Sequence, residues 1–74
     1  MSATALTAAQ ARYLREIAAA GFAGRTYNGR AGVVLRNLRS QGLITFTFDL
    51  IPQSSGRYAE SYTAHLTDAG RARL

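Results

Sequence analysis

The sequence predicts a small α+β domain with two helices, a β-hairpin and a short C-terminal helix. Its 74 residues suit one domain, so residues 1–74 are predicted to form a single domain. Up to residue 41 the apolar residues recur at helical spacing. Residues 43–66 instead alternate apolar and polar side chains on both sides of a short polar turn. These two patterns, in this order, define the predicted fold class.

The first helix is predicted over residues 7–20. Thr7 and Gln10 fit a capping box, in which each side chain accepts a hydrogen bond from a backbone amide of the first turn. Gly21 provides the stop, and Phe22 is expected to anchor the loop that follows. The residues expected on the core face of this helix are Leu6, Tyr13, Leu14, Ile17 and Ala18.

A second helix is predicted over residues 28–41, after the polar, glycine-bounded break at residues 24–29. Thr26 or Asn28 is the candidate N-cap, and Gly42 ends the helix. The side expected to pack on the core carries Ala31, Leu35 and Leu38, with Val34 on its flank. The opposite side carries Gly29, Arg30, Val33, Arg36, Asn37 and Ser40, with Arg39 at its edge.

The hairpin is predicted from strands at 43–51 and 57–66, joined by the turn sequence PQSSG. The residues expected on one face of these strands are Ile44, Phe46, Phe48 and Leu50, then Tyr58, Tyr62, Ala64 and Leu66. A short helix over 67–74 completes the chain. Thr67 is its N-cap, and Asp68 suits the positive end of the helix dipole.

The charge of the chain indicates a polyanionic partner. Nine basic residues against four acidic ones give a net charge of +5. All nine are arginine, whose planar fork pairs with phosphate and with guanine, although a GC-rich genome would also favour arginine over lysine. No acidic residue lies between Glu16 and Asp49, so the whole second helix is free of negative charge.

The outward side of the second helix therefore suits a DNA major groove. Arginine can pair with guanine or with a phosphate, asparagine with adenine, and valine can contact a thymine methyl group. Gly29 and Gly32 would let the backbone approach the partner closely; alternatively they ease packing, and the arginines only confer solubility. The predicted DNA-binding residues of this helix are Asn28, Arg30, Val33, Arg36, Asn37 and Ser40.

Two linked motifs carry a family resemblance. The first is Leu-x-x-x-Gly-Leu at Leu38, Gly42 and Leu43; the second is Leu-Thr-x-x-Gly-Arg at Leu66, Thr67, Gly70 and Arg71. Together with the hairpin between them they resemble the winged helix-turn-helix domains of bacterial regulators of the MarR-like or PadR-like kind, over residues 26–74. The resemblance implies a recognition helix at 28–41 and a wing whose tip is the 53–57 loop.

The same resemblance implies contacts to phosphate or by the wing, although the wing loop has the alternative of an ordinary solvated turn. The residues assigned to these contacts are Arg25, Thr26, Tyr27, Gln53, Ser54, Ser55 and Arg57. The chain departs from the family between Gly21 and Asn28, where the separate helix that normally precedes the recognition helix is expected to be lost or reduced to a single turn.

The leading hypothesis is a winged-helix protein that binds double-stranded DNA and regulates transcription in a bacterium, phage or plasmid. The alternative is a protein-binding module, such as a phage-type inhibitor of a host complex, with the first helix or the aromatic hairpin as contact surface; a homodimer through the first helix is also considered. With no cysteine, a single histidine (His65) and no phosphate-binding loop, no enzyme activity, cofactor or metal is expected. A cytoplasmic protein without a membrane segment is expected.

Overall fold

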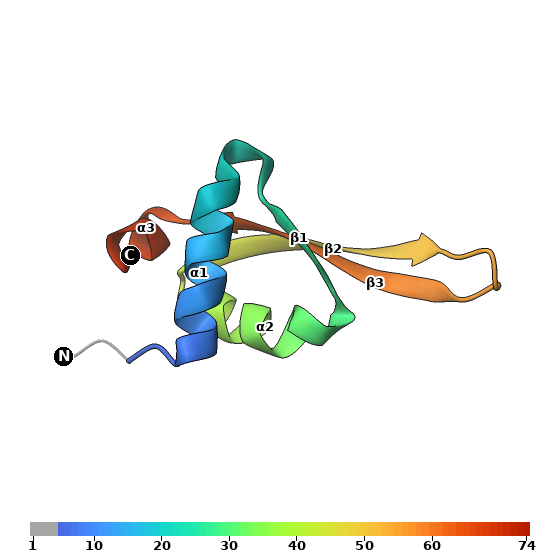
Figure 1. The fold of residues 1–74 in the computed structure, drawn as a ribbon, viewed down its shortest axis with the longest axis horizontal. Helices are drawn as coiled ribbons and strands as arrows, with labels where there is room; N and C mark the ends of the chain where they lie inside the picture. The colour runs from blue at the N-terminus through green and yellow to red at the C-terminus, as the bar shows by residue number, and fades with distance from the viewer. Residues whose placement is uncertain (1–4) are drawn as a thin grey trace.

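The computed structural model describes residues 5–74 and confirms a small α+β domain with a β-hairpin (Figure 1). Along the chain, two helices alternate with short turns and a strand before the hairpin, and a short helix follows it. The elements are α1 (Ala8–Ala20), the 3-10 turn η1 (Gly21–Ala23), β1 (Arg25–Asn28), the 3-10 turn η2 (Gly29–Ala31), α2 (Gly32–Ser40), β2 (Ile44–Pro52), β3 (Tyr58–Leu66) and α3 (Asp68–Ala72).

Helix α1 forms as predicted. It begins at Ala8 with Thr7 as its N-cap; Thr7 Oγ1 accepts a hydrogen bond from the amide of Gln10 at 3.1 Å, and Gln10 Oε1 accepts one from the amide of Thr7 at 3.0 Å. This capping box satisfies two amides that the helix itself leaves without partners. Leu14 and Ile17 of α1 are buried, so the predicted face of the helix packs on the core.

The prediction of a helix over residues 28–41 was wrong at its start, and the break before it is partly a strand. Residues 25–28 form strand β1, which pairs antiparallel with β3, and η2 separates it from α2, which begins at Gly32 rather than at residue 28. Asn28 does act as a cap, but of η2: its Oδ1 accepts a hydrogen bond from the amide of Arg30 at 3.0 Å. The segment is extended because β3 offers it backbone partners that a local sequence pattern does not reveal.

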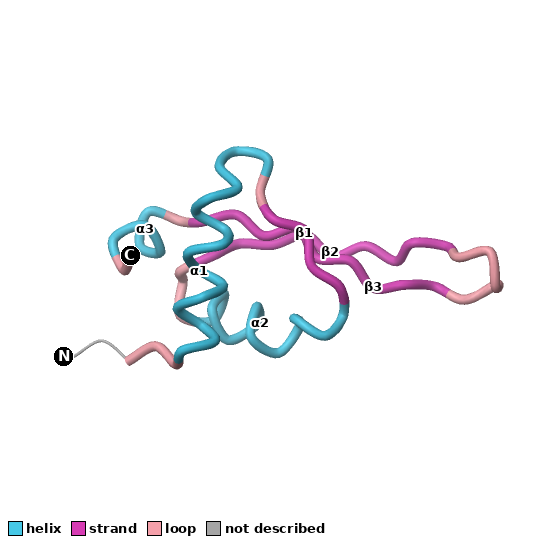
Figure 2. Tube along the Cα trace, in the orientation of Figure 1, coloured by secondary structure: helices cyan, strands magenta, loops and turns pink. Residues whose placement is uncertain are grey.

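The three strands form one antiparallel sheet in the order β1-β3-β2. In the hairpin Phe46 lies opposite Ala64 and Phe48 lies opposite Tyr62, which agrees with the predicted face. Figures 1 and 2 show that the hairpin runs well beyond the helices, and the molecule is 48 Å in its longest dimension. Burial therefore fades along the predicted face: Ile44 is buried, whereas Leu50 is 55% exposed because no helix covers it.

The core lies where α1, α2 and the inner half of the sheet meet. Helix α2 ends at Ser40 with Gln41 as its C-cap, and the positive φ of Gly42 lets the amide of Leu43 donate to the carbonyl of Leu38 at 3.1 Å. The buried hydrophobic residues are Leu14, Ile17, Ala31, Leu35, Leu38, Leu43, Ile44, Tyr62 and Ala64. The predicted core side of the second helix is thus confirmed for Ala31, Leu35 and Leu38.

The two motifs behind the family resemblance contact each other directly. Thr67 Oγ1 donates a hydrogen bond to the carbonyl of Gly42 at 2.6 Å and accepts one from the amide of Gly70 at 3.0 Å, so Thr67 caps α3 as predicted. A Cβ atom at Gly70 would collide with the carbonyl oxygen of Leu43. Glycine is therefore required where α3 packs against Leu43, in the segment between α2 and β2.

Candidate nucleic-acid interface

The side of α2 that was predicted to face outward is exposed. Val33 is 65% exposed and presents an apolar side chain on this side of the helix. The side chain of Asn37 makes no hydrogen bond within residues 5–74, whereas the hydroxyl of Ser40 donates to the carbonyl of Asn37 at 2.8 Å. Arg30, in η2, is also exposed. This surface offers a partner one free amide, one apolar contact and a guanidinium.

Arg36 is exposed, but its side chain lies against the sheet. Its Nη2 donates a hydrogen bond to the hydroxyl of Tyr62 at 3.0 Å. Tyr62 is only 2% exposed, and its ring is held between Phe46 and Phe48 at centroid distances of 5.1 and 5.0 Å. A buried, tightly packed tyrosine thus orients the guanidinium, which keeps its other N–H groups for a further acceptor.

Arg39 lies on the other side of the same aromatic group. Its guanidinium carbon is 4.5 Å from the centroid of the Phe46 ring, within the range of a cation–π interaction. A shallow cleft of about 230 Å³ lies between α2 and the base of the hairpin. We refer to it as the arginine–aromatic cleft; its lining residues are Arg36, Arg39, Phe46, Phe48 and Tyr62.

The glycine at the start of α2 serves this packing and not a close approach to a partner. Gly32 is buried, and a Cβ atom there would lie 2.9 Å from the hydroxyl oxygen of Tyr62 and 3.4 Å from Nη2 of Arg36. Of the two interpretations of the helix glycines, packing is therefore correct for Gly32. Gly29 is exposed, and a Cβ atom there would meet the side chain of Glu60 at 3.2 Å.

Of the residues before η2, Tyr27 is less accessible than the resemblance implies, whereas Arg25 and Thr26 are exposed. The hydroxyl of Tyr27 donates to Oε1 of Glu16 at 2.8 Å, and its ring packs edge-on against Tyr13 at 4.9 Å. Burial, together with the hydrogen bond to Glu16, raises the pKa of Tyr27 above its ordinary value. Tyr27 therefore faces α1. Arg25 is on the same face of β1, 5.6 Å from the Tyr27 ring, while Thr26 is exposed on the opposite face.

In the loop at the end of the hairpin, one side chain forms hydrogen bonds within the turn and three others do not. The amide of Gln53 donates to the carbonyl of Arg57 at 2.8 Å, and its side-chain amide donates to the carbonyl of Ile51 at 3.1 Å, so Gln53 holds the turn closed. Ser54, Ser55 and Arg57 are exposed, and their side chains make no hydrogen bond within residues 5–74.

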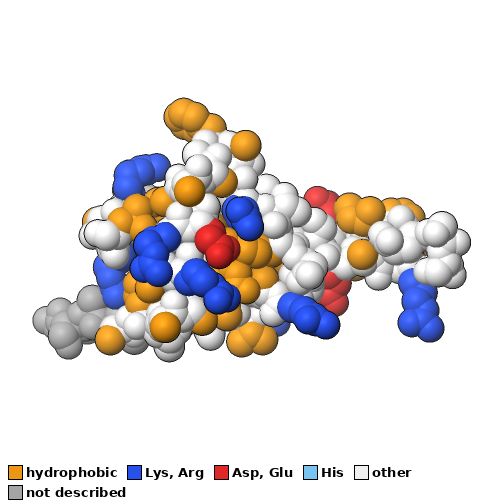
Figure 3. Space-filling model, in the orientation of Figure 1, with side chains coloured by type: hydrophobic (Ala, Val, Ile, Leu, Met, Phe, Trp, Pro, Cys, Tyr) orange, Lys and Arg blue, Asp and Glu red, His pale blue; other side chains and the backbone are white. Residues whose placement is uncertain are grey.

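Acidic side chains are distributed so that the α2 surface stays basic. Two carboxylates are paired with arginines of their own helices: Glu16 with Arg12 at 3.8 Å, and Asp68 with Arg71 at 3.0 Å. Within the described residues, no carboxylate lies within ion-pair distance of the arginines of η2, α2 or the hairpin loop. Figure 3 shows basic side chains near the start of α2 and at the far end of the hairpin. These positions give a nucleic acid two separated points of electrostatic contact.

Glu60 is the exception to this arrangement. It lies opposite Leu50 in the hairpin register, on the face that α2 shares, and its side chain adjoins Gly29. Asp49 lies opposite Ser61 and is therefore on the other face of the hairpin. One carboxylate thus borders the basic surface and a second one faces away from it.

The sequence analysis missed the aromatic half of the cleft. It placed Arg39 only at the edge of the helix surface and treated Phe46, Phe48 and Tyr62 as core or contact residues. The alternation of the two strands did assign these rings to one face. What the alternation lacked was the way the hairpin packs on α2, since Arg36 and Tyr62, which form the hydrogen bond of the cleft, are 26 positions apart.

Comparisons with protein-family models, with curated proteins and with solved structures found no match to this chain. In the described part of the chain, no cluster of three or more histidine, aspartate or glutamate side chains is arranged to hold a metal ion. Within the same residues, none of the helices has the length and apolar character needed to span a bilayer. The geometry of the chain itself therefore carries the functional argument.

Proposed function

We propose that this chain binds double-stranded DNA as a winged helix-turn-helix protein, with α2 as the recognition helix and the β2–β3 hairpin as the wing. The observation that carries the proposal is the arginine–aromatic cleft. Two guanidiniums are oriented there by aromatic neighbours and have no carboxylate partner within residues 5–74. Oriented, unpaired guanidiniums favour a phosphate, because the phosphate supplies the missing acceptors without reorganisation of the site.

The cleft and the outward side of α2 have different parts in this proposal. Arg36 and Arg39 grip the DNA backbone, which fixes the register of α2 without reading sequence. Val33 and Asn37, which are exposed on the outward side of α2, then contact base edges in the major groove. Arg57 at the hairpin end supplies a second backbone contact, as a wing does. In this arrangement Arg36 is a phosphate ligand and not a reader of guanine.

The cellular role that best suits such a protein is transcription regulation in a bacterium, phage or plasmid. The proposal is tested by amide chemical-shift mapping with a short duplex of random sequence. Shifts are expected in residues 29–40, in the cleft and in the 53–57 loop. Shifts confined to α1 and α3 would contradict the proposal, because those helices lie outside the surface described here.

A second candidate is a protein-binding module, favoured by the exposed apolar side chains of the outer hairpin. Leu50, Ile51 and Tyr58 are 55%, 46% and 64% exposed, on a two-stranded ribbon that no helix covers. Leu50 and Tyr58 share one face of this ribbon, and exposed apolar groups gathered in this way are typical of a protein contact. If this candidate is correct, replacing Leu50 and Tyr58 by serine abolishes capture of the partner, whereas replacing Arg36 and Arg39 by glutamine does not.

A further inference from the structure

Phe22 is the most exposed apolar residue of the described chain, and it lies beside an apolar cavity. The sequence predicted an anchor in the loop after α1, but the side chain is 106% exposed. It projects from η1, a turn closed by a hydrogen bond from the amide of Gly24 to the carbonyl of Gly21 at 3.1 Å. Both glycines have positive φ, 67° and 76°, so the chain uses conformations specific to glycine to present this ring to solvent.

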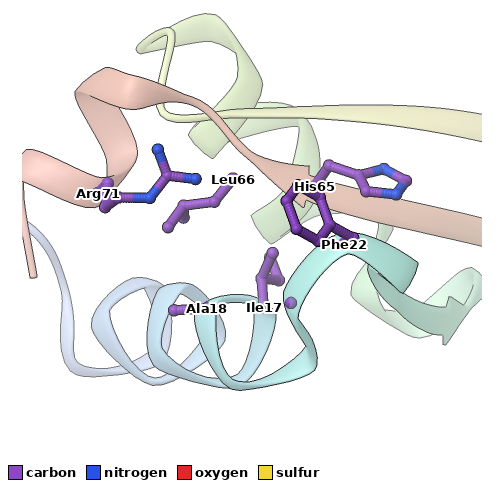
Figure 4. Close-up of a pocket in the computed structure, with 7 residues that line it drawn as sticks. Ile17, Ala18, Phe22, His65, Leu66 and Arg71 are labelled. Carbon is purple, nitrogen blue, oxygen red and sulfur yellow. The ribbon is translucent and has the colours of Figure 1, made fainter.

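The adjacent cavity has a volume of about 390 Å³ and lies between α1, β3 and α3. Figure 4 shows Ile17 and Ala18 of α1 on one side, Leu66 of β3 and Arg71 of α3 on another, and Phe22 with His65 at the rim. Its walls are mostly apolar, and the Arg71 guanidinium provides a surface that stacks well on an aromatic face. We refer to this cavity as the Phe22 pocket.

We propose that two copies of this chain associate by exchanging Phe22, each ring entering the Phe22 pocket of the other copy. The projecting ring and the cavity lie side by side on one surface. A two-fold rotation therefore places the ring of each copy opposite the cavity of the other. A single contact type then fills both cavities and buries both rings. The proposal concerns self-association and does not depend on whether the chain binds DNA.

The charge of this surface favours a second copy over a charged partner. Residues 17–24 contain no charged side chain, in a chain whose net charge is +5. Arg71, which lines the pocket, is paired with Asp68 at 3.0 Å. Two copies of a basic protein therefore meet with less charge repulsion here than at α2, whereas an acidic partner is drawn to the arginines of α2.

The expected dimer is weak, because two phenyl rings and a short alanine-rich segment form a small interface. Sedimentation velocity over a concentration series should give a monomer–dimer equilibrium with a Kd between about 10 µM and 1 mM. Phe22→Ser should raise this Kd at least about tenfold. The matched control is Leu74→Ser, which removes another exposed apolar side chain, outside the pocket lining, and should leave the Kd unchanged.

A second measurement locates the contact. In an equal mixture of ¹³C-labelled and unlabelled protein, filtered NOEs are expected from the Phe22 ring of one copy to the methyl groups of Ile17 and Leu66 of the other. A protein that stays monomeric to about 1 mM overturns the proposal. So does a dimer that Leu74→Ser weakens and Phe22→Ser does not. If the monomer instead binds phenylacetate at the Phe22 pocket, the cavity is a ligand site and the proposal is likewise overturned.

Discussion

The Nη2 atom of Arg36 and the hydroxyl of Tyr62 are 3.0 Å apart, and this hydrogen bond joins the outward side of α2 to a buried residue of the hairpin. Tyr62 is 2% exposed and packed in the core, so its hydroxyl has a fixed position. The hydrogen bond therefore restricts the orientation of the Arg36 guanidinium at the surface. An arginine held in this way loses less side-chain entropy when it binds an anion than a free one does.

The first prediction concerns this pair. Arg36→Gln should weaken binding to duplex DNA about tenfold at low salt, and Tyr62→Phe about threefold, because the phenylalanine variant keeps the ring but releases the guanidinium. In the Arg36→Gln background the effect of Tyr62→Phe should disappear. Fluorescence anisotropy measures all four proteins. Tyr13→Phe, which removes a hydroxyl outside the cleft, is the control; equal losses in the two tyrosine variants would contradict a positioning role for Tyr62.

The second prediction distinguishes the two glycines at the start of α2. Gly29→Ala should change the free energy of unfolding by less than about 0.5 kcal/mol, since it meets only an exposed side chain. Gly32→Ala should lower it by about 1–2 kcal/mol, because the new methyl group overlaps the Tyr62 hydroxyl despite the better helix propensity of alanine. Urea denaturation checks both. The Tyr62→Phe background should remove much of the cost at Gly32; an unchanged cost there would show that the clash lies elsewhere.

The third prediction uses the carboxylate that borders the basic surface. Glu60→Gln should tighten DNA binding about two- to fivefold at low salt, because it removes a negative charge from the face that the DNA approaches. Asp49→Asn makes the same charge change on the other face of the hairpin and should have a smaller effect. Equal gains in affinity from the two variants would mean that only the net charge of the protein affects binding. They would contradict the prediction that one particular face of the hairpin lies against the DNA.

The fourth prediction follows from the raised pKa of Tyr27. The folded state holds the phenolic proton more tightly than the unfolded state, whose tyrosine pKa is about 10. The resulting stability is present in full below that pH and is lost as the pH rises through the higher folded-state pKa. Wild-type stability should therefore fall more steeply above about pH 10 than that of Tyr27→Phe. Urea denaturation at several alkaline pH values measures this, and parallel pH profiles would rule it out.

Much of the fold follows from local sequence signals. The capping box of α1, the glycine after α2 and the Thr67 cap each depend on residues three or four positions apart, and each was predicted. The hairpin was predicted to within one residue at each end, because strict alternation on both sides of a turn fixes its register.

The remainder depends on contacts between distant residues. Strand β1 has only four residues and no apolar alternation; it exists because β3 supplies its hydrogen-bond partners. Likewise the bond between Arg36 and Tyr62 requires the hairpin to fold back beneath α2. The exposure of Phe22 was not predicted for a different reason. The sequence indicates that its ring is apolar, but not that the turn η1 holds the ring away from the core.

The most direct test of DNA binding is anisotropy of a labelled random duplex, titrated with the protein over a series of salt concentrations. Log Kd should rise linearly with log salt, with a slope that corresponds to about three to five phosphate contacts. Replacing Arg36 and Arg39 together by glutamine should lower that slope by about two, whereas Arg15→Gln on α1 should leave it nearly unchanged. Folded protein that fails to bind the duplex even at about 50 mM salt would contradict the proposal that this chain binds double-stranded DNA.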